Sequence, residues 1–71
     1  MNLDQFKGSW HQFKGKVKEQ WGDFTDDDLT KIEGSYEKMC GALQEKYGYT
    51  KEKAHQQIDD LYNKMHPNRE E

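Results

Sequence analysis

Apolar and aromatic residues recur every three or four positions along almost the whole chain, and this spacing strongly restricts the fold. It places these residues on one face of an α-helix, whereas a half-buried strand would need strict alternation. The series are Phe6, Trp10, Phe13, Val17, Trp21 and Phe24; then Leu29, Ile32, Tyr36, Met39, Leu43 and Tyr47; then Ala54, Ile58, Leu61, Tyr62 and Met65. Because no alternating Val/Ile/Thr run accompanies them, the pattern predicts an all-α protein.

Capping residues divide the chain into about four helices. Thr25 precedes three aspartates, and Thr50 precedes a charged first turn, which is typical of a helix start. Gly22 and Gly48 stand where helices are expected to end, because glycine tolerates the left-handed closing residue. We expect a short turn or helix near residues 3–7 and helices near 9–21, 26–47 and 51–65. The helix over 26–47 is expected to kink or break at Gly34-Ser35.

The sequence contains an internal repeat of 15 residues. GSWHQFKGKVKEQWG (8–22) matches GSYEKMCGALQEKYG (34–48) at an offset of 26 in its glycines and apolar positions. An aromatic–Thr pair follows each copy, with one residue fewer in the second linker. The match favours a duplicated helix–turn–helix unit over a coincidence between two amphipathic helices. Two such hairpins, each too small to bury its own face, would pack crosswise into one compact bundle.

Each copy carries a glycine in mid-helix, Gly15 and Gly41. Such a glycine costs about 1 kcal/mol relative to alanine. We therefore hypothesise that both mark equivalent close contacts between helices, at sites where a Cβ would collide. The other structural positions of the repeat are its core residues, Trp10, Phe13, Trp21, Tyr36, Leu43 and Tyr47.

Length and composition indicate the number of domains, whether the chain folds and where it is expected to act. The 71 residues allow one domain, which we place at 1–66, followed by a flexible tail at 67–71 after Pro67. Mean hydropathy is −1.40, which leans towards disorder, but 13% of the residues are aromatic, which favours a folded domain with a thin core. Cys40 is alone, and the chain shows neither a signal peptide nor an apolar run of membrane-spanning length. The expected location is the cytoplasm, and a monomer is the default.

Residues that could carry chemistry are few. His11, His55 and His66 have no partner at metal-ligand spacing, so surface histidines are expected. Cys40 fits a small hydrophobic residue better than a reactive thiol. The aspartates at 26–28 lack the alternation and glycine of a calcium loop and fit a helix start. We predict no metal, no cofactor, no catalytic residue and no enzyme activity.

Lys7, Lys14 and Lys18 are the candidate contacts for nucleic acid or a protein partner. They are expected on one side of the first long helix, with tryptophans nearby, and such interleaving can follow single-stranded nucleic acid. The alternative is an ordinary solvated face, which is favoured because the patch is small and the acidic stretch 23–28 follows it directly.

Three segments, WHQFKGKVKEQWG, FTDDDLTKIEG and GALQEKYGYT, resemble the CsbD-like family of small bacterial general-stress proteins over residues 1–60. The resemblance implies a compact SAM-like domain of two crossed helical hairpins. It also implies an abundant cytoplasmic protein, raised in stationary-phase, osmotic or envelope stress, with no catalytic residues to carry over. Cys40 and the ending MHPNREE depart from the family pattern, which leaves a redox or partner role open.

Low hydropathy and frequent glycine are also similar to the hydrophilins, which protect macromolecules when water is scarce. The function expected is therefore a non-catalytic stress-response protein that protects macromolecules. The alternative is a small helical module that binds nucleic acid or a protein.

Overall fold

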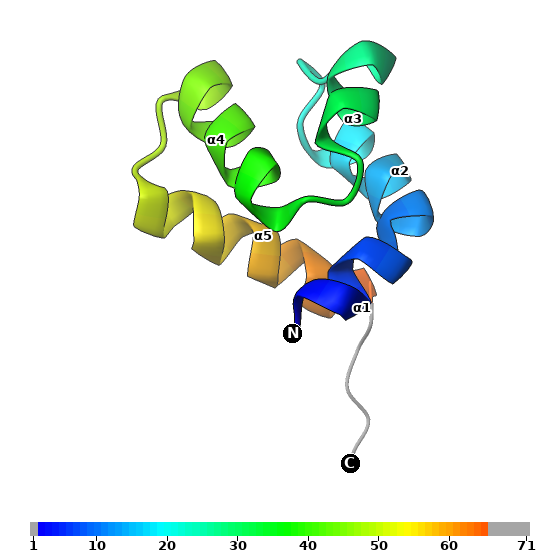
Figure 1. Ribbon diagram of the computed structural model, residues 1–71. Coiled ribbons are helices and arrows are strands. Elements are labelled where there is room, and N and C mark those ends of the chain that lie inside the picture. Colours follow the sequence, from blue (N-terminus) through cyan, green and yellow to red (C-terminus); the bar gives the residue numbers. More distant parts are fainter. Residues whose placement is uncertain (1, 66–71) are drawn as a thin grey trace.

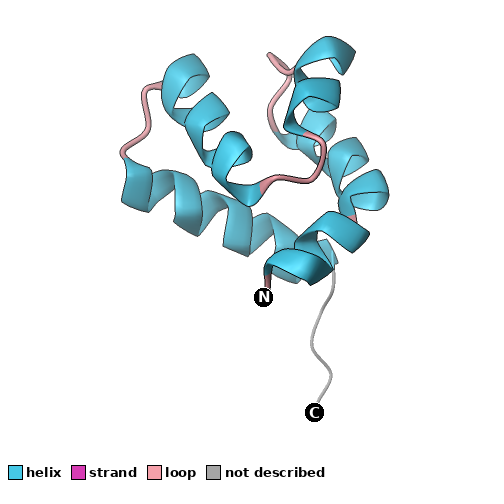
Figure 2. Ribbon diagram, in the orientation of Figure 1, coloured by secondary structure: helices cyan, strands magenta, loops and turns pink. Residues whose placement is uncertain are grey.

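Helices account for most of residues 2–65, the part of the chain that the computed structural model describes (Figure 1). They are α1 (Leu3–Gly8), α2 (Trp10–Gln20), α3 (Asp26–Ile32), α4 (Tyr36–Tyr47) and α5 (Lys51–Met65). Within 2–65 no strand joins them (Figure 2), which confirms the all-α bundle. The tail predicted at 67–71 lies outside the described residues.

The helix expected over 26–47 is broken into α3 and α4. Two consecutive left-handed residues, Glu33 with φ 49° and Gly34 with φ 79°, end α3 and turn the chain. The start of α3 agrees with its sequence signal: the Thr25 hydroxyl accepts a hydrogen bond from the Asp28 amide at 3.1 Å. The Asp28 carboxylate in turn accepts one from the Thr25 amide at 3.0 Å. This reciprocal capping box confirms that the aspartates at 26–28 begin a helix.

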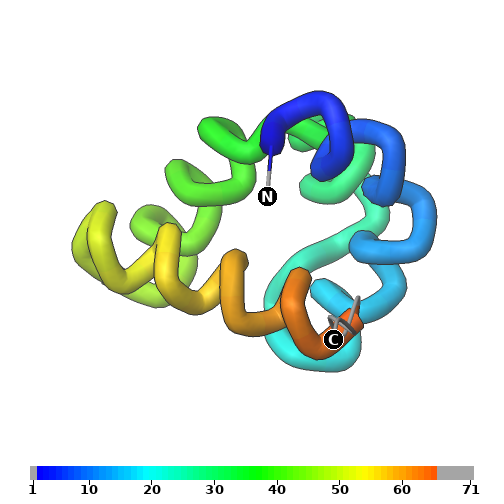
Figure 3. Tube along the Cα trace, turned by 90° about the horizontal axis from the view of Figure 1, so that it is seen from below, coloured from blue at the N-terminus to red at the C-terminus, as the bar shows by residue number. Residues whose placement is uncertain are grey.

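The long helix α5 runs across the base of the molecule (Figure 1). It packs most extensively on α4 and also contacts α2, while α1 bridges α2 and α4, and α3 rests on α4. Seen from below, α1 and α5 lie on opposite sides, and α2 closes the side between them (Figure 3). The repeated units are thus α2–α3 and α4–α5, joined through the Glu33-Gly34 turn.

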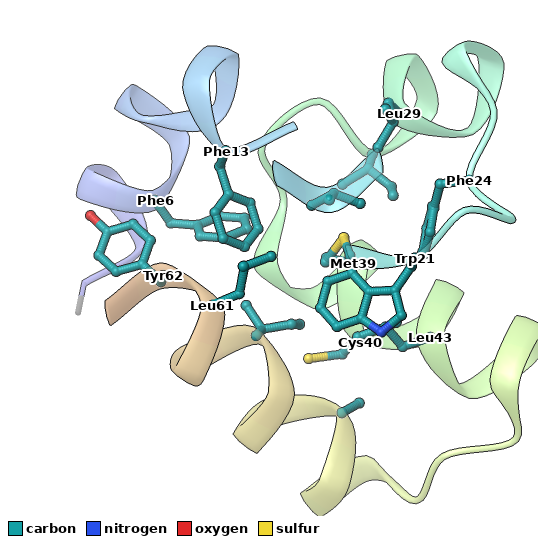
Figure 4. Packing of buried hydrophobic residues seen from close by; sticks show 14 residues of the cluster. Phe6, Phe13, Trp21, Phe24, Leu29, Met39, Cys40, Leu43, Leu61 and Tyr62 are labelled. Atoms are coloured by element: carbon teal, nitrogen blue, oxygen red, sulfur yellow. The ribbon is translucent and has the colours of Figure 1, made fainter. Parts of the chain in front are cut away.

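The core is built from the helical series of the sequence, to which Cys40 is added (Figure 4). Its buried members are Phe6, Phe13, Val17, Trp21, Phe24, Leu29, Ile32, Met39, Cys40, Leu43, Ala54, Ile58, Leu61 and Tyr62. Trp10, Tyr36 and Tyr47 pack against its edge. Phe6 anchors the short helix α1, because its ring lies 5.1 Å from that of Phe13 and 5.5 Å from that of Tyr36, centroid to centroid.

Candidate functional site

A groove of about 750 Å³ lies beside α4. We call it the Gly41 groove. Its floor is formed by α4, and its walls come from α1, from the turn before α4 and from the start of α5. It is lined by Leu3, Asp4, Lys7, Gly34, Ser35, Tyr36, Glu37, Cys40, Gly41, Gln44, Lys51 and His55.

A smaller groove of about 320 Å³, the Gly15 groove, lies between α2 and α3. It is lined by His11, Lys14, Gly15, Lys18, Asp26, Leu29 and Thr30.

The two grooves are equivalent in the internal repeat. At the offset of 26, the four α2 residues that line the Gly15 groove correspond to four α4 residues that line the Gly41 groove. The pairs are His11 and Glu37, Lys14 and Cys40, Gly15 and Gly41, and Lys18 and Gln44. At an offset of 25, set by the shorter second linker, Asp26 and Thr30 correspond to Lys51 and His55. The duplication therefore extends from the core to the surface.

The expectation that Gly15 and Gly41 allow close helix contacts is wrong. A Cβ added at either position would meet nothing within 4 Å, because each glycine faces its groove. The close approach occurs at Gly34 instead. A Cβ there would lie 3.2 Å from the Lys7 Cα and 3.2 Å from the Trp10 Cβ, where the chain of α1 and α2 passes over the α3–α4 turn. Mid-helix position indicated a special role for a glycine but not whether the space beside it is filled or empty.

A small polar network lies at the edge of the Gly41 groove. The Tyr36 hydroxyl donates to Asp59 Oδ1 at 3.0 Å, and its ring meets that of His55 edge-on at 5.1 Å between centroids. Burial, followed by the hydrogen bond to Asp59, raises the pKa of Tyr36 above its usual value, so the phenol stays protonated. Sequence reasoning missed Asp59, because the contact joins residues 23 positions apart.

The Cys40 thiol lies under the groove floor with only 4% of the residue exposed. Burial, with the nearby Asp59 carboxylate adding to it, raises the pKa of the thiol to about 11. Because the thiolate is the reactive form, such a thiol is a weak nucleophile near neutral pH. The environment is thus that of a structural cysteine.

The candidate lysines do not form one stripe. Residues 7, 14 and 18 would share a face only on one continuous helix, but the chain changes direction at Ser9, between α1 and α2. Lys7 therefore lines the Gly41 groove, while Lys14 and Lys18 line the Gly15 groove. Lys18 is also paired with Asp26 at 2.7 Å, and this contact lowers the pKa of that carboxyl.

The described residues do not bring the candidate metal-binding side chains together. His11 and His55 lie in different grooves, and no group of three His, Cys, Asp or Glu side chains within 2–65 could hold a metal ion. His66 lies outside the described part. None of the helices found there is long and apolar enough to span a membrane.

Comparison with known proteins identifies the family. A model of the CsbD-like family matches residues 4–56. The chain is 59% identical over 58 residues to UPF0337 protein ECA0631 of Pectobacterium atrosepticum, covering 82% of this chain and 84% of that protein. It is 55% identical over 60 residues to UPF0337 protein YjbJ of Escherichia coli K12, covering 84% and 87%. With UPF0337 protein PA4738 of Pseudomonas aeruginosa the identity is 49% over 65 residues, covering 92% and 100%. This bacterial, all-helical chain therefore belongs to the CsbD-like family.

Proposed function

We propose that this chain is a non-catalytic cytoplasmic protein of the general stress response, which protects other macromolecules in osmotic or stationary-phase stress. The observation that carries the proposal is how strictly polar side chains lie at the surface and large hydrophobic ones in the core. Within residues 2–65 no polar or charged residue is buried, and Leu3 is the single large hydrophobic residue that is exposed. A charged surface with so few exposed large hydrophobic side chains resists aggregation at high concentration.

The chemistry of the grooves supports a role without catalysis. The Cys40 thiol and the Tyr36 phenol both have raised pKa values, so neither is activated as a nucleophile or base near neutral pH. Membership of the CsbD-like family supports the stress response as the cellular context.

The test is protection of a dehydration-sensitive enzyme during drying and rehydration. We expect wild-type protein to preserve more activity than an equal mass of a less charged globular protein. The matched control is the triple variant Lys7→Glu/Lys14→Glu/Lys18→Glu, which stays hydrophilic but reverses the candidate contacts for nucleic acid. Protection should survive in this variant; no advantage of the wild type over the globular protein would refute the proposal.

A second candidate function is binding of nucleic acid at the Gly15 groove, because His11, Lys14 and Lys18 line it together. Titration of ¹⁵N-labelled protein with short duplex DNA at low salt separates the two functions. Binding would shift the amides of Lys14 and Lys18, would weaken steeply with salt and would be lost in the triple variant. The amide of Lys7 is an internal reference, since Lys7 lines the other groove. A spectrum that stays unchanged would exclude this second function.

A further inference from the structure

The Gly41 groove is an open space that no packing contact within the described residues explains. Gly41 lies in the middle of α4, where alanine would favour the helix, and no side chain of the described residues fills the space beside it. A glycine that neither allows an internal contact nor adopts a positive φ leaves room for something from outside the chain.

The charged groups around the Gly41 groove are unpaired, in contrast to those of its repeat equivalent. In the Gly15 groove, Lys18 of α2 pairs with Asp26 of α3. The equivalent positions in the Gly41 groove are Gln44 and Lys51, which cannot form an ion pair with each other. The groove also holds Asp4, Lys7 and Glu37, and none of its four charged side chains is in an ion pair within residues 2–65.

The rim of the same groove carries Leu3, the exposed hydrophobic residue of the described part, with 67% of its surface accessible. Leu3 belongs to the first turn of α1, whose buried anchor is Phe6. An apolar side chain therefore stands beside a depression floored by Gly41 and the almost fully buried Cys40.

We propose that the Gly41 groove is a self-association surface. Two copies of the chain pack about a two-fold axis, and Leu3 of each copy enters the space above Gly41 of the other. A two-fold interface joins one patch to itself, so each feature must find its complement on the same patch. This patch meets that condition, because it carries both the apolar side chain and the depression.

The charges of the groove support a second copy over other occupants. Two acids, Asp4 and Glu37, and two bases, Lys7 and Lys51, line one patch, so their formal charges cancel. An acidic or basic partner would leave two like charges opposed, whereas a second copy brings equal numbers of both signs. One groove of this size gives a small interface, so the dimer should form only at high concentration, with a dissociation constant on the order of 0.1–1 mM.

Sedimentation equilibrium and ¹⁵N amide spectra, recorded from about 20 µM to about 1 mM in the presence of a reductant, test this proposal. The wild type should shift towards dimer with concentration, with amide changes at Leu3, Asp4 and Gly41. Leu3→Lys and Gly41→Leu should each weaken association by at least about tenfold. The first variant alters an exposed side chain and should leave the fold intact.

The matched control is Gly15→Leu, which fills the equivalent space in the other repeat and should associate as the wild type does. A wild type that stays monomeric up to about 1 mM would overturn the proposal. So would a dimer that Leu3→Lys leaves unchanged, or one that Gly15→Leu weakens as strongly as Gly41→Leu.

Discussion

Alanine substitutions at four glycines test how the structure uses the space beside each one. Gly15 and Gly41 lie in mid-helix beside open grooves, so Gly15→Ala and Gly41→Ala should each raise the free energy of unfolding by about 1 kcal/mol. For a domain of this size, that corresponds to an increase of about 4–8 °C in melting temperature. The two sites face different grooves, so the double variant should gain about 2 kcal/mol.

The two glycines with positive φ should respond in the opposite direction. Gly48 has φ 69° and open space around it, so Gly48→Ala should cost about 1–2 kcal/mol through backbone strain alone. Gly34 has φ 79°, and its new Cβ would lie 3.2 Å from the Lys7 Cα, which can move only with the backbone of α1. Gly34→Ala should therefore cost about 1–3 kcal/mol more than Gly48→Ala.

Urea unfolding followed by far-UV circular dichroism measures all four variants, provided that the slope against urea stays that of the wild type. A loss of stability in Gly15→Ala or Gly41→Ala would show that these glycines do serve internal packing. Equal losses in Gly34→Ala and Gly48→Ala would show that the contact between α1 and the α3–α4 turn is not tight.

Three further predictions follow from the polar contacts. Lys46, whose Nζ lies 2.8 Å from Asp28 Oδ2, and then the capping hydrogen bonds with Thr25 lower the pKa of Asp28 to about 2. This carboxylate therefore stabilises the fold above its unfolded pKa of about 4, and its contribution is lost as the pH falls towards 2. In Asp28→Ala, unfolding measured across that range should depend less on pH; an unchanged dependence would exclude Asp28 as its source. Tyr36→Phe removes the hydrogen bond to Asp59 but keeps the ring, so calorimetry should show a loss of about 1 kcal/mol, and no loss would mean that the bond contributes nothing. The Cys40 thiol, with a pKa of about 11, should react slowly with a disulfide reagent at pH 8 in the folded protein and rapidly in urea, whereas equal rates would contradict its burial.

Much of the fold could be predicted from local patterns. The spacing of apolar residues placed the helices, because burial on one face requires a period near 3.6. Thr25 and the aspartates after it located the start of α3, because capping is decided within four residues. The repeat identified the equivalent units α2–α3 and α4–α5, and the family resemblance was confirmed by comparison.

The tertiary arrangement determined everything that depends on residues distant in sequence. The path of α1 decides that Gly34, and not Gly41, lies against another helix. The change of direction at Ser9 separates Lys7 from Lys14 and Lys18. The sequence repeat shows that two helices are alike, but the packing of α1 and α5 makes one groove larger than the other. The physical reason is the distance along the chain over which each effect acts. Periodicity and capping depend on residues within one or two helical turns, whereas the positions of several helices together decide whether a space is open or filled.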